Sequence, residues 1–398
     1  MPSNFWPMSS NESDSNFKII WNHFQQLEEQ IGAVSNELPV IEKMVERLRE
    51  QSTEQNTERS EEAGKQYNLL SELNKKADSI CAAIFAKEYP IDVRFEREYY
   101  KNFPTGQSEE FPDFQQKFLN LVCGLDTKSI EDVVLSIQRL KIIQNTQDPV
   151  IALYSQEEKK IMREIIEHMF SSILPLSHNV FYYCGYLLPI NHFEPCVFWD
   201  RYGIQHLTKP GHFSDADIID AGAFIGDSAL IFSPLTHRNV YAFEPVPQNY
   251  RYMQDTIKLN GLTNVVPVQA ALGEQNGTIS ISVNDSSSTQ FENDACKYAE
   301  KVEAKVVPMD EFVREHNLRV GLIKADVEGA EQSLLKGAMQ TIKEQKPTLL
   351  ISIYHNADDF FHIKPMLEQL NLGYRFKIRH PVCGSVMTET LLIAEAEQ

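Results

Sequence analysis

The chain has 398 residues, 42% of them hydrophobic, and a formal net charge of −19 at pH 7. This length predicts two or three regions rather than a single domain. The acidic balance argues against binding to nucleic acid, whose phosphate backbone requires basic protein surfaces. Six scattered cysteines, none in a C-x-x-C pair, argue against a disulfide framework or a zinc site. No secretory signal and no apolar run of ~20 residues is visible, so we expect a cytoplasmic protein whose membrane contact, if any, is peripheral.

The first region, residues 1–85, shows a heptad pattern. Apolar residues recur at alternating spacings of four and three from Ile20 to Leu48, which is typical of a coiled coil. Pro39 falls inside this pattern and predicts a kink or two helical pieces in register. The apolar seam predicts a homo-oligomer. The alternative is that these helices fold back on their own chain.

The second region, residues 86–211, has the pattern of a mostly helical module. Asp126 precedes a run with apolar residues at helical spacing, so we expect it to cap that helix. An aromatic-rich stretch follows at residues 181–203. Such a stretch is more often core between docked parts than a ligand surface, and Tyr186 and His192 are its best candidates for ligand contact.

The third region, residues 212–398, alternates strand and helix patterns, which predicts an α/β fold with a parallel sheet covered by helices on both faces. Each of five predicted core strands ends in a polar residue: Asp220, Glu244, Gln269, Asp326 and His355. In such a sheet, ligands bind outside the carboxyl ends of the strands. The polar strand ends therefore predict a single site at this edge.

The turn after the first of these strands reads G-A-F-I-G and contains Gly222 and Gly226. Glycines let backbone N–H groups approach a ligand closely, and the helix that follows adds partial positive charge. The G-x-G-x-x-G fingerprint of dinucleotide sites is absent, and Asp220 in front of the turn would repel a pyrophosphate. Glu244, about two dozen residues beyond the turn, is where a ribose diol would be held. The pattern favours S-adenosylmethionine over a dinucleotide.

The predicted cofactor site combines the glycine turn, the helix start and the ends of the next two strands: Asp220, Gly222, Phe224, Gly226, Asp227, Ser228, Glu244, Gln269 and Ala270. Asp220 would accept a hydrogen bond from a ligand amino group, directly or through water. Gln269 and Ala270 would lie at the adenine edge. Asp326 and His355 are the catalytic candidates, with His355 as general base. The alternatives are a helix-capping role for Asp326 and a structural role for His355.

Three runs carry a family resemblance: D-A-G-A-F-I-G-D-S-A-L from residue 220, Y-A-F-E-P-V-P-Q-N-Y from residue 241 and I-K-A-D-V-E-G-A-E from residue 323. Over residues 193–394 the sequence resembles FkbM-type methyltransferases, of the kind associated with bacterial surface glycans. The resemblance implies a Rossmann-like class I methyltransferase sheet, S-adenosylmethionine as cofactor, and methyl transfer to a hydroxyl of a sugar or glycan. The strand ends show no dense Asp cluster, so no metal is expected.

Two other functions compete with this enzyme. One is a coiled-coil scaffold of a glycan-biosynthesis system whose methyltransferase domain only binds cofactor. The other is a nucleotide-sugar dehydrogenase. Asp220 and the form of the glycine turn count against the dehydrogenase, and polar residues at all five strand ends count against an inert domain.

Overall fold

The structure is a computed structural model that describes residues 91–105, 113–147, 150–151, 153–284, 287–289 and 300–396. All of these residues lie in one compact unit, Pro90–Gln398. The predicted coiled coil of residues 1–85 lies outside the described residues, so it stays a prediction together with the homo-oligomer. The boundary expected after residue 211 falls inside the unit. Within the described part of the chain, no helix combines the length and apolarity needed to cross a membrane.

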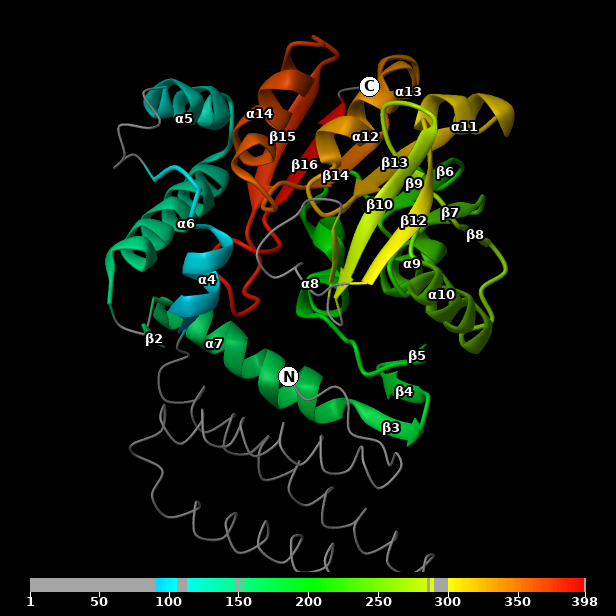
Figure 1. The fold of residues 1–398 in the computed structure, drawn as a ribbon, viewed down its shortest axis with the longest axis horizontal. Helices are drawn as coiled ribbons and strands as arrows, with labels where there is room; N and C mark the ends of the chain where they lie inside the picture. The colour runs from blue at the N-terminus through cyan, green and yellow to red at the C-terminus, as the bar shows by residue number, and fades with distance from the viewer. Residues whose placement is uncertain are drawn as a thin grey trace, which may run out of the picture. The chain divides into compact units, whose positions relative to one another are not determined.

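A seven-stranded sheet forms the centre of this unit, in the order β15-β16-β14-β13-β6-β7-β8 (Figure 1). The strands are β6 Asp217–Ala221, β7 Val240–Phe243, β8 Val265–Val268, β13 Val320–Ala325, β14 Thr348–Ser352, β15 Tyr374–Arg379 and β16 Leu391–Ala396. The five strands from β14 to β8 run parallel, and β16 pairs antiparallel with both β14 and β15. The chain moves outward from β6 to β8 and then returns to β13, so the strand order reverses between β6 and β13. The predicted Rossmann-like α/β sheet is confirmed.

Helices cover both faces of the sheet (Figure 1). One face carries α8 Pro195–Phe198, α9 Asp227–Phe232 and α10 Pro247–Leu259; the other carries α12 Glu331–Gly337, α13 Met339–Gln345 and α14 Ala357–Glu368, with α11 Met309–Glu315 packed on α12 and α13. Successive strand side chains point to opposite faces, so a strand covered on both sides buries all of its side chains and is mostly apolar. Every residue of β6 and β14 is buried, as this arrangement requires.

Residues 91–188 add a layer of helices and short strands beside the sheet. The elements are β1 Ile91–Asp92, α4 Val93–Tyr99, α5 Phe114–Val122, α6 Thr127–Asn145, β2 Val150–Ile151, α7 Gln156–Glu164, β3 Leu174–Ser177, β4 Val180–Tyr183 and β5 Tyr186–Leu188. Helix α6 packs against β15, and α5 packs against α14. Asp126 caps α6 as predicted, since its side chain accepts from the Ser129 N–H at 2.7 Å. The same carboxylate binds Arg379 of β15 at 2.8 Å, which ties this layer to the sheet.

The aromatic-rich stretch is core, as the sequence favoured. Tyr183, Phe193 and Phe198 are buried, and their rings contact one another in edge-on or tilted pairs. Helix α8 begins at Pro195. Proline is tolerated in the first turn of a helix, where its missing N–H leaves no bond unmade.

A separate four-stranded sheet has the order β11-β10-β12-β9. Its strands are β9 Ala271–Leu272, β10 Gly277–Asn284, β11 Ser287–Thr289 and β12 Glu300–Val307.

Candidate functional site

The glycine turn lies between the carboxyl ends of β7 and β13. Gly222 has φ +76°, and a Cβ there would lie 1.7 Å from the carbonyl oxygen of Asp326, so only glycine fits. Gly226, with φ +81°, precedes α9. The N–H groups of Gly222 and Ala223 both donate to the carbonyl of Phe243 at the end of β7. The turn is thus fixed against both neighbouring strands.

Glu244 is held by the backbone of this turn and of the loop after β7. Its carboxylate accepts from the Phe224 N–H at 3.1 Å and from the Val246 N–H at 2.8 Å. Phe224 itself is strained at φ +47°. Burial raises the pKa of Glu244 to about 8, against the opposing effect of its backbone bonds. Oε1 also accepts a long bond from the Asn249 amide at 3.5 Å, whereas Oε2 keeps a further lone pair. A ligand hydroxyl that replaced the Asn249 bond, together with a second one on Oε2, would give the group two ligand hydroxyls.

Asp220 is fully buried and already has protein partners. Its carboxylate accepts from the Ser228 hydroxyl at 2.7 Å and lies 3.3 Å from the ammonium of Lys324. Lys324 also donates to the Gly222 carbonyl at 2.6 Å. The sequence analysis expects Asp220 to accept from a ligand amino group, directly or through water; in this structure its Oδ1 is buried without a hydrogen-bond partner.

Lys324 is a site residue that the sequence analysis missed. Burial alone would lower its pKa, but the carboxylates of Asp220, Asp326 and Asp227 raise it, so the ammonium stays charged. It also lies 5.1 Å from the ring centroid of Tyr202. The available signal was a lysine in the middle of an apolar strand, because a buried lysine requires a charged partner nearby.

The remaining cofactor candidates lie along the same edge. Asp227 and Ser228 begin α9 and are both buried, and burial raises the pKa of Asp227 to about 6. Gln269 is exposed and Ala270 is buried, directly after β8. The Glu244 N–H donates to the carbonyl of Val268, which keeps the ends of β7 and β8 together. The structure therefore brings the predicted cofactor residues to one edge.

Asp326 and His355 lie side by side at the ends of β13 and β14. His355 Nε2 is 3.4 Å from Asp326 Oδ1 and 3.7 Å from Glu328 Oε2, and its Nδ1 is 3.1 Å from Glu331 Oε1. Asp326 Oδ2 accepts from the Tyr202 hydroxyl at 2.9 Å. The side chain of His355 is only 3% exposed. The predicted pairing of these strand ends is present, together with two glutamates that the sequence analysis did not select.

The charges of His355 and its neighbouring carboxyl groups affect one another's pKa values. Burial would lower the pKa of His355, but the carboxylates of Glu331, Glu328 and Asp326 raise it to about 10. The imidazole is therefore charged at neutral pH. Burial and the neighbouring carboxylates in turn raise the pKa of Glu328 to about 7, although His355 opposes them. The two glutamates stand in D-V-E-G-A-E, where their spacing suggested only a helix start.

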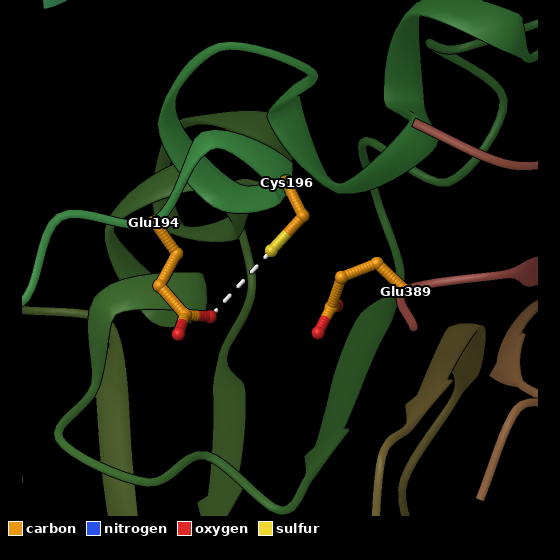
Figure 2. A group of neighbouring side chains, drawn as sticks. All are labelled: Glu194, Cys196 and Glu389. Carbon is orange, nitrogen blue, oxygen red and sulfur yellow. Dashed lines mark hydrogen bonds between the residues drawn. The ribbon is translucent and has the colours of Figure 1, made fainter. Parts of the chain in front are cut away.

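A second acidic group includes Glu389, which interacts electrostatically with Asp326 and His355. Figure 2 shows the side chains of Glu194, Cys196 and Glu389 pointing toward one another. The Cys196 thiol donates to Glu194 at 3.6 Å, and Glu389 accepts from the Tyr354 hydroxyl at 3.2 Å. The ring of Tyr354 lies 4.0 Å from that of His355. The two acidic groups thus face one region of the site.

The two predicted aromatic contacts differ in position. His192 Nε2 lies 3.1 Å from Glu194, and its ring lies edge-on to Phe224 with centroids 4.9 Å apart, so it borders the glycine turn. Tyr186 packs against Phe198 in the core. Of the two, only His192 is placed by these contacts next to the site.

Comparisons with known proteins found one matching family model and several similar proteins. Residues 220–376 match the family model described as the methyltransferase FkbM domain. "Methyltransferase 1" of Beauveria bassiana (strain ARSEF 2860) is 25% identical over 189 residues, which cover 42% of this chain and 75% of that protein. The crystal structure of methyltransferase FkbM from Methylobacillus flagellatus KT is 19% identical, with a TM-score of 0.46, over 72% of this chain and 60% of that one. A putative methyltransferase from Streptococcus mutans, solved in complex with SAH, is 15% identical, with a TM-score of 0.28, over 51% of this chain and 97% of that one.

Proposed function

We propose that this protein, whose residues 220–376 match the methyltransferase FkbM domain, transfers a methyl group from S-adenosylmethionine to a hydroxyl of a sugar or glycan. One observation carries the proposal. The cofactor residues at the ends of β6 and β7 and the Asp326–His355 pair at the ends of β13 and β14 share one edge of the sheet. The strand order reverses between them, which is where such sheets bind ligands.

The cofactor half of the site suits the parts of S-adenosylmethionine. Glu244 would accept from both ribose hydroxyls, and the turn held open by Gly222 lets the backbone approach the ligand. In the reaction, an acceptor oxygen attacks the methyl carbon while the carbon–sulfur bond breaks and its electron pair stays on sulfur. The positive sulfonium becomes a neutral thioether, and the hydroxyl proton leaves. The carboxylates at this edge favour the positive charge of the reactant form.

The acceptor half of the site must remove the proton of the attacking hydroxyl. His355 is the predicted base and stands beside Asp326 at the end of β14. An imidazole accepts a proton only when it is neutral, whereas the surrounding carboxylates keep His355 charged in this structure. A role as base therefore requires a change in the charge of this group of side chains.

A sugar or glycan acceptor is supported by the lining of this half. Tyr99 is 40% exposed, and burial together with the carboxylates of Glu328 and Asp326 raises the pKa of its phenol. An aromatic face together with carboxylates that accept hydroxyl hydrogen bonds is the combination that proteins use to hold sugars. The assay described next identifies the acceptor and the hydroxyl that is methylated.

The test has two stages. Calorimetry on the full chain should show binding of S-adenosylhomocysteine and none of NAD. Transfer of a labelled methyl group from S-adenosylmethionine is then measured on a panel of sugars and glycans by mass spectrometry. NAD binding would support the dehydrogenase instead, and cofactor binding with no transfer to any acceptor would support the scaffold.

A further inference from the structure

We propose that Asp326, Glu331 and His355, here called the acid–imidazole cluster, bind a divalent metal ion at the acceptor end of the site. One ligand atom from each residue lies within 4.8 Å of the others. The three side chains come from the end of β13, the first residue of α12 and the loop after β14. The inference shares its location with the proposed function, but binding of the ion does not depend on methyl transfer.

Buried polar atoms in this cluster lack hydrogen bonds. Among the described residues, Glu331 Oε2 and both ring nitrogens of His355 are buried without a hydrogen-bond partner. Glu331 is 0% exposed, and the His355 side chain is 3% exposed. Their mutual contact, 3.1 Å from Nδ1 to Oε1, is an ion-pair distance. Buried polar atoms without hydrogen bonds are costly, and an ion coordinated by Glu331 and by one ring nitrogen of His355 would satisfy two of these three atoms.

The cluster also carries more negative charge than its protein cations offset. Glu328 lies 3.7 Å from His355, and Asp359, 1% exposed, interacts with Glu331. Three carboxyl groups therefore lie within 3.7 Å of one imidazole, and a fourth, Asp359, lies beside Glu331. The nearby ammonium of Lys324 is already engaged with Asp220 and the turn. Buried charges in proteins are paired or coordinate metals, and a divalent cation fits this excess.

The donor set indicates the kind of ion. One imidazole nitrogen with two carboxylate oxygens suits Mn²⁺ or Zn²⁺ better than Mg²⁺, which prefers an all-oxygen shell. With the ion bound, His355 is a ligand rather than a base. The ion would then polarise the acceptor hydroxyl and make its proton easier to lose. The sequence analysis expected no metal, because these three ligands come from separate elements and form no local motif.

The experiment uses the full-length chain freed of metal with EDTA and then titrated calorimetrically with MnCl₂, ZnCl₂ or MgCl₂. We expect one Mn²⁺ per chain, bound at least about tenfold more tightly than Mg²⁺. Glu331→Gln and His355→Gln should each weaken Mn²⁺ binding by about 10- to 100-fold or more. Glu344→Gln is the matched control, since it removes the same charge from an exposed position on α13, just before β14 begins, and should leave Mn²⁺ binding unchanged.

Three results would overturn the inference: no Mn²⁺ or Zn²⁺ binding by the natural sequence, unchanged binding in both cluster variants, or an equal loss in Glu344→Gln. If the cluster variants fail to fold, Asp326→Asn and a Mn²⁺-dependent rise in the unfolding temperature of the unaltered chain provide the test. S-adenosylhomocysteine is titrated into the same samples. If the protein binds S-adenosylhomocysteine but no metal ion, only the metal site is rejected. If it binds the metal ion but not S-adenosylhomocysteine, only the proposed function is rejected.

Discussion

Gly222 and Asp326 are in direct contact: a Cβ on Gly222 would lie 1.7 Å from the carbonyl oxygen of Asp326. The turn that would hold the cofactor and the strand end that would face the acceptor therefore pack against each other with no space between them. The N–H of Asp326 also donates to the carbonyl of Ala221, directly before the turn. A change at either residue should disturb both halves of the site.

Gly222→Ala should lower both stability and affinity for S-adenosylhomocysteine. The methyl group cannot fit beside Asp326, and the positive φ alone costs an L-residue roughly 1–2 kcal/mol. Thermal unfolding and ligand titration measure the two effects. Gly211→Ala is the control, because nothing lies within 4 Å of its would-be Cβ. Equal behaviour of the two variants would mean that the turn is not packed as described.

Glu244→Ala should weaken binding of S-adenosylhomocysteine by roughly 1–3 kcal/mol, because two ribose hydroxyls lose their acceptor. The Phe224 and Val246 N–H groups lose theirs as well, so unfolding is measured in parallel. Calorimetry on the variant gives the affinity. An unchanged affinity would remove Glu244 from the cofactor site.

Affinity for S-adenosylhomocysteine should rise with pH up to about 8. Burial raises the pKa of Glu244 to about 8, so below that pH the carboxyl is protonated in the free protein. Ribose hydroxyls bind the ionised form better, so binding releases a proton, and affinity increases by up to about tenfold per pH unit below the pKa. The titrations are run from pH 7 to 9, above the pKa of about 6 of Asp227, so that this neighbouring carboxyl is mostly ionised throughout.

The difference between the natural sequence and Glu244→Gln isolates this effect from other groups that titrate nearby. The variant cannot ionise at this position, so its affinity should lose this component of the pH dependence. Identical pH profiles for the two proteins would show that Glu244 does not titrate on binding.

His355→Ala should reduce methyl transfer by on the order of 10²–10⁴-fold and leave affinity for S-adenosylhomocysteine nearly intact. The reason is its position at the end of β14, beyond the cofactor strands β6 and β7. Single-turnover rates and ligand titration separate the two quantities. If the variant lost transfer rate and cofactor affinity in parallel, or kept both unchanged, a role of His355 at the acceptor would be contradicted.

Residues 1–85 should set the oligomeric state. The apolar seam from Ile20 to Leu48 would expose its side chains on an isolated helix, so its burial between chains is favoured. Ile31→Glu combined with Leu38→Glu should dissociate the assembly, measured by light scattering, without changing cofactor binding. A monomer for both the natural and the substituted chain would show that the seam packs within its own chain.

The sequence by itself determined the order of the elements and the edge of the sheet where the site lies. The strand at Val240–Phe243 follows from a continuous apolar run, and Asp326 and His355 end up together because parallel strands present their carboxyl ends on one side. The glycine turn was also visible, since glycine at fixed spacing after a strand has few other uses. These are local signals, and local periodicity is what a single sequence records.

Only the tertiary structure decided which partner each charged side chain has. Asp220 pairs with Lys324 because β13 lies next to β6, although more than 100 residues separate the two. Glu331 meets His355 because the start of α12 returns over the end of β14. These contacts decide whether a carboxylate is free to accept a hydrogen bond from a ligand, is paired with a cation, or is placed where it could coordinate a metal ion. They depend on strand order and helix placement, and neighbouring residues in the sequence do not encode the distances between such elements.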